Sequence, residues 1–319
     1  MRIARMQQLF KDAAAEHDHK IPMQIDIIGF SRGAAQARDF ANELVLAAPN
    51  GIYTFKNADG IDVCQPLNFR FMGLWDTVLS NNDSKYEYKL DIPKQFGYVA
   101  HAIALNEYRS ANISNWVQRN PLPGGDQVGG FPLESISGLE TPPNTTRIER
   151  GFLGAHADIG GGYEINNELS LVALNWMVKQ ATNAQVPMKG NAPAIPDKSA
   201  LVHEQSNVIH LGNPNVRGTF THNGLATGTR LSRNAEDRLV KRSCNPSAAA
   251  TRTCRGGTTT QRALNFDNNS MTNAETHELI SYTARDVHAP AGSPGMKQTT
   301  GIVNLTNYVK WLKDRGYDF

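Results

Sequence analysis

The sequence predicts an α/β fold: a three-layer α/β/α sandwich around a mostly parallel sheet. A short apolar strand, residues 25–28, runs through a glycine-containing turn into a segment whose apolar residues recur at helical spacing up to position 48. Further apolar runs and helical patterns follow along the chain, and polar residues come directly after several of the runs. In open α/β sheets, functional groups gather at this carboxyl edge of the strands.

The composition is that of an ordinary globular chain, with 319 residues, 40% hydrophobic and 19% charged. The formal net charge of +2 is too small to indicate a nucleic-acid partner. No apolar run approaches the roughly 20 residues that span a bilayer. Residues 1–19 have the pattern of an amphipathic helix and not of a signal peptide, so any export would proceed without a Sec-type signal in this chain.

The turn between the first strand and the first helix contains a sequence pattern typical of a catalytic serine. Gly29-Phe30-Ser31-Arg32-Gly33 is a G-x-S-x-G sequence. A strand before it and a helix after it form the context of the nucleophile elbow in α/β-hydrolases. We therefore predict that Ser31 is a nucleophile, that the glycines allow close approach of strand and helix, and that the N–H of Arg32 stabilises an oxyanion.

The remaining elements are predicted in order from periodicity and turn residues. A hairpin or loop is expected at 53–63 and a strand at 67–74, then a helix at 93–111, a surface loop at 119–146, a strand at 147–157, a helix at 168–184, a break at 186–199, a strand at 208–211, and helices at 274–286 and 302–315. We divide the chain into a catalytic core (1–211), a polar insertion or cap (212–273) and C-terminal helices that pack on the core (274–319).

A serine nucleophile needs a histidine base, and the histidine needs a carboxylate to orient it. In α/β-hydrolases the chain order is serine, acid, histidine. Two aspartates follow predicted strands, Asp158 and Asp76. Asp158 precedes three glycines that let the backbone turn its carboxylate back into a site, and it is the preferred acid. Asp76 is the alternative acid, with a loop-holding role as its other interpretation.

His203 is the preferred base, because it lies on a predicted loop after the helix that follows Asp158. Chain order alone also permits His277 and His288. His101 is interpreted as a core residue. His156 and Asp158 form an H-x-D pair that could bind a metal. No third ligand follows at a sequence spacing typical of a metal site, so neither a metal nor another cofactor is expected.

The chain has three cysteines. Cys64 stands alone. Cys244 and Cys254 bracket a short loop that a disulfide could close in an oxidising compartment, and free thiols are the equal alternative.

Five blocks together resemble one family. They are G-F-S-R-G-A at 29–34, G-L-W-D-T-V at 73–78, H-A-I-A-L-N-E-Y-R at 101–109, G-A-H-A-D-I-G-G-G-Y at 154–163 and V-H-E at 202–204. In this order they resemble the α/β-hydrolase domain of type VI secretion lipase effectors of the first Tle family. The resemblance covers roughly residues 25–210 and implies Ser31, Asp158 and His203 as the triad.

Two features differ from the family pattern. Only 28 residues precede Gly29, and the early D-G-T-x-N-like block is missing. We therefore expect that the chain lacks an N-terminal part or that another segment completes the sheet. The family often has H-D-S at its catalytic histidine, where this chain has His203-Glu204-Gln205.

The sequence thus predicts a serine hydrolase of carboxylic esters in lipids, a phospholipase A or lipase without a cofactor. The resemblance implies an antibacterial effector that is delivered by a contact-dependent secretion apparatus and acts in the periplasm or at the membrane of a target cell. It also implies a cognate immunity protein, a secretion-apparatus partner and transient contact with a membrane surface. The alternatives are an esterase of small soluble esters and a catalytically silent binding or toxin module.

Overall fold

The computed structural model describes residues 8, 21–57, 59–78, 88–104, 133–136, 141–203 and 296–319, and short strands between 239 and 287. Its central sheet has the strand order β1-β3-β4-β6, from Met23–Phe30, Asp62–Trp75, Tyr98–Ala104 and Thr146–Phe152. All three pairings along this path are parallel. The carboxyl ends of these strands therefore meet at one edge of the sheet. The predicted α/β class with a mainly parallel sheet is confirmed.

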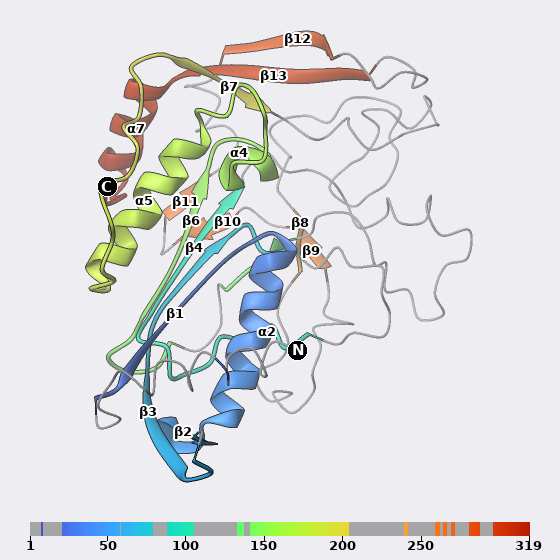
Figure 1. Ribbon diagram of the computed structural model, residues 1–319. Coiled ribbons are helices and arrows are strands. Elements are labelled where there is room, and N and C mark those ends of the chain that lie inside the picture. Colours follow the sequence, from blue (N-terminus) through green and yellow to red (C-terminus); the bar gives the residue numbers. More distant parts are fainter. Residues whose placement is uncertain are drawn as a thin grey trace, which may run out of the picture.

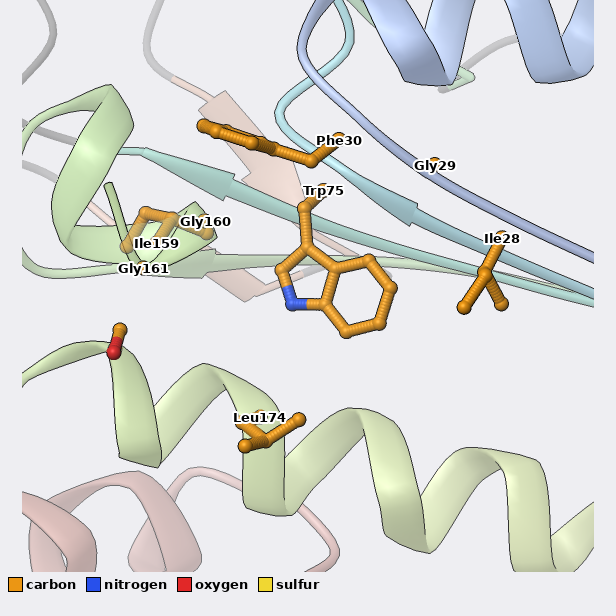
Figure 2. Close-up of a pocket in the computed structure, with 9 residues that line it drawn as sticks. Ile28, Gly29, Phe30, Trp75, Ile159, Gly160, Gly161 and Leu174 are labelled. Atoms are coloured by element: carbon orange, nitrogen blue, oxygen red, sulfur yellow. The ribbon is translucent and has the colours of Figure 1, made fainter.

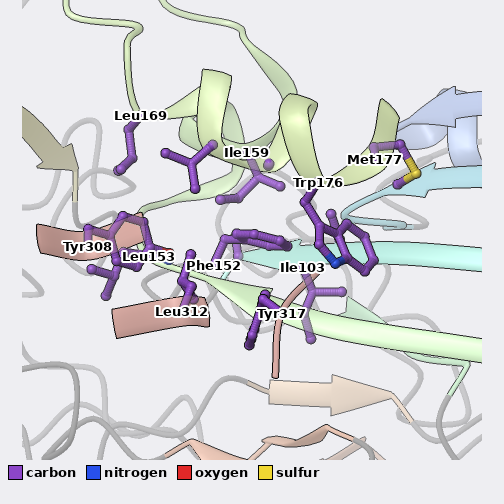
Figure 3. Close-up of a cluster of buried hydrophobic side chains, with 14 of the residues drawn as sticks. Ile103, Phe152, Leu153, Ile159, Leu169, Trp176, Met177, Tyr308, Leu312 and Tyr317 are labelled. Atoms are coloured by element: carbon purple, nitrogen blue, oxygen red, sulfur yellow. The ribbon is translucent and has the colours of Figure 1, made fainter. Parts of the chain in front are cut away.

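Helices cover both faces of the sheet (Figure 1). Helix α2 (Arg32–Ala47) lies on one side, where its alanines and Leu44 form a buried cluster with residues of β1, β3 and β4. Helices α5 (Ser170–Asn183) and α7 (Leu305–Asp314) lie on the other side. Figure 3 shows their cluster, in which Phe152 packs against Trp176 and Tyr317 at centroid distances of 5.4 Å each.

Several predicted elements are confirmed. The first strand and helix are β1 and α2, and the helix expected at 168–184 is α5. The hairpin expected at 53–63 is formed by β2 (Ile52–Lys56), which pairs antiparallel with the first part of β3. The strand expected at 67–74 is part of β3, and the strand expected at 147–157 is β6, which already ends at Phe152. A short helix, α4 (His156–Gly160), begins where the second of these was expected to end.

The helix expected at 93–111 is wrong, since residues 98–104 form β4. This strand lies between β3 and β6, and all its residues except Tyr98 are buried. A strand covered on both faces shows no alternation of polar and apolar residues, so its apolar run resembles a buried helix.

The C-terminal prediction also needs correction. Residues 281–286, expected to end a helix, belong to strand β12 (Ser281–Val287), which pairs with β13 (Met296–Asn304). Helix α7 begins at Leu305, three residues later than expected at 302. Asn304 caps it by accepting the N–H of Asn307 at 2.9 Å, so the strand runs directly into the helix.

The third strand of this antiparallel sheet is β7 (Ser199–His203), which pairs with β13. His203 was expected on a loop, but it is the last residue of β7. Short strands are also present at Leu133–Glu134 (β5), Leu239–Lys241 (β8), Thr259–Gln261 (β9), Leu264–Phe266 (β10) and Asn269–Met271 (β11).

Some predictions fall on residues outside the described ones. They are the helix at 1–19 apart from Gln8, the strand at 208–211, most of the loop at 119–146 and of the insertion at 212–273, and the residues Cys244, Cys254, His277 and His288. The division into three domains therefore stays a prediction. No helix in the described ranges combines the length and the apolar character that crossing a bilayer requires.

Candidate active site

Ser31 occupies a strained turn between β1 and α2. Its backbone angles are φ 61° and ψ −130°, in a region that residues other than glycine rarely adopt. The turn is fixed by the Ser31 N–H, which donates to the carbonyl of Trp75 at 2.9 Å, and by the Ser31 carbonyl, which accepts the N–H of Ala34 at 3.0 Å. The sequence therefore places the serine at the carboxyl end of β1, at the N-terminus of a helix.

The glycines of this turn play different parts. A Cβ on Gly29 would lie 2.6 Å from the carbonyl oxygen of Gly33 and 2.7 Å from Cα of Ala34. The close approach predicted for Gly29 is therefore present. A Cβ on Gly33 would meet nothing within 4 Å, so the same expectation for Gly33 is wrong. At Gly33 it is the backbone carbonyl that approaches the strand.

The imidazole beside Ser31 belongs to His156. Its Nε2 lies 2.7 Å from Oγ of Ser31, although the two residues are 125 positions apart in the chain. Its Nδ1 lies 2.5 Å from Oδ2 of Asp76. Since a neutral imidazole has one donor and one acceptor nitrogen, the carboxylate selects the tautomer with the proton on Nδ1. Nε2 then faces the serine hydroxyl as the acceptor of its proton.

Asp76 is completely buried and well anchored at the end of β3. Its second carboxylate oxygen, Oδ1, accepts the N–H of Ala104 at 2.8 Å, and its own N–H donates to the carbonyl of Ala102 at 2.7 Å. Its φ of 44° is also in the left-handed region. The carboxylate is thus held against β4 in a fixed direction, toward His156.

The predicted pair of Asp158 and His203 is present, but in another place. Nδ1 of His203 lies 2.7 Å from Oδ1 of Asp158, as expected for an acid that orients an imidazole. Oδ2 of Asp158 accepts the backbone N–H groups of His203 at 2.9 Å and of Ala155 at 3.0 Å. The ring of Tyr163 stacks on His203 with centroids 3.9 Å apart.

This pair therefore holds backbone, while the imidazole at Ser31 is that of His156. Ala155 is the residue before His156, so Asp158 fixes the start of the short helix that carries the imidazole. Burial raises the pKa of Asp158, and the bonds from His203 and the two N–H groups oppose that shift.

A third imidazole–carboxylate pair contacts the residue that follows Asp76. Nδ1 of His101 lies 2.9 Å from Oε2 of Glu149, and both residues are buried. The interpretation of His101 as a core residue is confirmed, although it lies in a strand and has polar partners. Nε2 of His101 accepts the N–H of Thr77, the residue after Asp76, at 3.0 Å.

Sequence reasoning missed His156 as the partner of Ser31, although a signal was present. Ser31, Asp76 and His156 occur in the order serine, acid, histidine. Each follows a strand of the same parallel sheet, so all three lie at its carboxyl edge. Among the described residues, no group of three or more His, Cys, Asp or Glu side chains is arranged to hold a metal ion.

Comparison with protein families gives one match. Residues 53–180 match the model described as the T6SS phospholipase effector Tle1-like catalytic domain. This part of the chain is similar to a Tle1-like catalytic domain. The family resemblance predicted from the five sequence blocks is thereby confirmed.

The matched segment includes Asp76 and His156 and begins after Ser31. The matched family is described as phospholipase effectors of the type VI secretion system, so this similarity implies a hydrolase. No curated protein matches the chain.

Proposed function

We propose that the protein is a serine hydrolase of carboxylic esters in lipids, with Ser31, His156 and Asp76 as its catalytic triad on an α/β-hydrolase fold. The observation that carries the proposal is the continuous chain of bonds from Ser31 Oγ to His156 Nε2 at 2.7 Å and from His156 Nδ1 to Asp76 at 2.5 Å. These distances and the order of the groups are those of a base-activated nucleophile. Asp76 and His156 replace Asp158 and His203 in the triad that the sequence suggested.

In the proposed mechanism, Ser31 Oγ attacks the ester carbonyl while His156 Nε2 takes the hydroxyl proton. The buried carboxylate of Asp76 stabilises the imidazolium that forms. The N–H of Arg32, at the N-terminus of α2, supports the oxyanion of the tetrahedral intermediate. His156 then gives its proton to the leaving alcohol, and a water molecule, activated by the same imidazole, hydrolyses the acyl-enzyme.

The family supports a phospholipid as the substrate and delivery by a type VI secretion system. We propose accordingly that the protein acts as an antibacterial effector in the periplasm or at the membrane of a target cell. A cognate immunity protein that blocks the site, a component of the secretion apparatus and transient membrane contact belong to the same proposal.

The test combines active-site labelling with fatty-acid release. A fluorophosphonate probe should label the wild type and fail to label Ser31→Ala. His156→Ala should lower the release of fatty acid from phospholipid vesicles by about 10³-fold or more, in the range for a lost triad member. His203→Ala, at a similarly buried histidine, is the matched control and should retain labelling. If Ser31→Ala keeps a tenth of the wild-type rate, or if His203→Ala is the variant that abolishes labelling, the proposal fails.

A further inference from the structure

An apolar cavity of about 280 Å³ lies beside the turn that carries Ser31 (Figure 2). It is partly open to solvent and is lined by the ends of β1 and β3, by α4 and by the first turns of α5, on the face of the sheet opposite α2. The side chains that form its walls are Ile28, Phe30, Trp75, Ile159 and Leu174. None of the described residues that line it is charged, and the hydroxyl of Ser170 already donates to the carbonyl of Asn167 at 2.7 Å.

Phe30 connects this cavity to the reacting groups. It directly precedes Ser31, and its ring lies 4.5 Å from the ring of His156, centroid to centroid. The Phe30 ring packs directly against Gly160, since a Cβ on that glycine would lie 2.2 Å from carbon atoms of the ring. One aromatic ring thus forms a wall of the cavity and a contact of the imidazole that would take the serine proton. Only the Phe30 side chain therefore lies between the cavity and a substrate held at Ser31.

We propose that this cavity binds the fatty acyl chain of the ester whose carbonyl Ser31 attacks. This assignment rests on the proposed function and adds the place where the substrate's chain lies. A phosphate headgroup would need cationic or N–H partners, which the uncharged lining does not offer. An acyl chain needs only a dry, apolar surface, and the volume is just below the range of small-molecule sites, as suits one chain and not a whole lipid.

The cavity has an exposed apolar side chain at its edge. Ile28 is 68% exposed although it lies on β1 among the cavity walls. Moving one methylene from water into such surroundings is worth about a fourfold gain in binding. If part of this gain reaches the transition state, kcat/KM should rise along a series of esters as the acyl chain lengthens.

The experiment measures kcat/KM of the full chain on p-nitrophenyl acetate, butyrate, octanoate and laurate. The wild type should prefer octanoate over acetate by at least about tenfold, the effect of two or more buried methylenes. Ile28→Asp should reduce that preference several-fold. The matched control is Leu46→Asp, on α2 at the opposite face of the sheet, where the leucine is 67% exposed. It should leave the whole series unchanged.

Leu174→Trp, which fills the cavity from α5, is the second variant and should shift the optimum toward shorter chains. The inference is overturned if both variants keep the wild-type profile, if Leu46→Asp alters it equally, or if the wild type shows no chain-length preference because something else covers the cavity. In these cases Ser31-dependent acetate hydrolysis would leave the proposed function standing. An absence of Ser31-dependent hydrolysis on every ester would refute both.

Discussion

The backbone N–H of Thr77 donates a hydrogen bond to Nε2 of His101 at 3.0 Å, directly after Asp76 in the chain. This bond requires Nε2 to be an acceptor, so Nδ1 carries the proton and donates to Glu149. The carbonyl of Thr77 is also bonded, because it accepts the N–H of Glu134 at 2.9 Å. The two hydrogen bonds of the Thr77 backbone therefore fix the strained backbone of Asp76 on its C-terminal side.

We predict from this bond that His101 is a positioning residue for Asp76. His101→Phe removes the acceptor, so the Thr77 peptide and the Asp76 carboxylate should shift, and small misplacements near reacting groups cost up to about 10²-fold in rate. kcat should fall while KM for short esters stays nearly constant. His101→Gln, which can both accept and donate, should restore part of kcat. A lower melting temperature with wild-type kcat in His101→Phe would limit the pair to a structural role.

The carboxylate of Glu149 gives a prediction about acid stability. Burial would raise its pKa, but the hydrogen bonds from His101, from Ser135 and from the N–H of Ile136 lower it below the usual value. A carboxylate whose pKa is lower when folded stabilises the protein above its unfolded pKa, about 4.3. This stabilisation is lost as the pH falls through the folded value.

Urea unfolding of the wild type and Glu149→Gln between neutral and strongly acidic pH checks this. The wild type should be more stable at neutral pH, and the difference should shrink as the pH falls below the unfolded pKa. Asp62→Asn is the control, because Asp62 forms an exposed ion pair with Lys56 that contributes little at any pH. A difference between wild type and Glu149→Gln that stays constant with pH would contradict the assignment.

Asp76 and Asp158 should respond differently to the same substitution. Asp76→Asn removes the charge that selects the His156 tautomer and should lower kcat by about 10⁴-fold with modest loss of stability. Asp158→Asn disturbs the bonds to His203 and Ala155, so it should mainly lower the melting temperature. Measuring kcat and melting for both variants separates the roles. The reverse pattern would return the acid to Asp158.

The strand–turn–helix around Ser31 could be predicted from sequence because all its determinants are local. The apolar strand, the two glycines and the helical spacing lie within residues 25–48, and the structure places β1, the strained serine and α2 there. Helix α5 was predictable for the same reason. The strand β4 was not, because a strand buried between two others has no alternation.

The partners of Ser31 could not be chosen from local pattern. The imidazole comes from a position 125 residues away, and the strand order β1-β3-β4-β6 brings it there. The sequence did identify an acid–imidazole pair in Asp158 and His203, at 2.7 Å. It could not show that the residue two places before Asp158 lies nearer to the serine, since that depends on where α4 begins.

The two glycines of the elbow offer a prediction that compares equal changes in one turn. Gly29→Ala would place Cβ 2.6 Å from the Gly33 carbonyl oxygen, a backbone atom that cannot rotate away. Strand and helix must then separate, which should cost about 1–3 kcal/mol of unfolding free energy. The bond between Ser31 and His156 should lengthen with them, so hydrolysis of short esters should fall as well.

Gly33→Ala is the control for this change, because its Cβ would meet nothing within 4 Å and the residue lies in the first turn of α2. Replacing a glycine whose backbone suits alanine stabilises a protein by roughly 0.4–1 kcal/mol through the unfolded chain. We therefore expect Gly33→Ala to unfold at an equal or higher urea concentration than the wild type and to keep its activity on acetate esters. Equal destabilisation by both substitutions would show that the two glycines are needed alike, against the asymmetry of the turn.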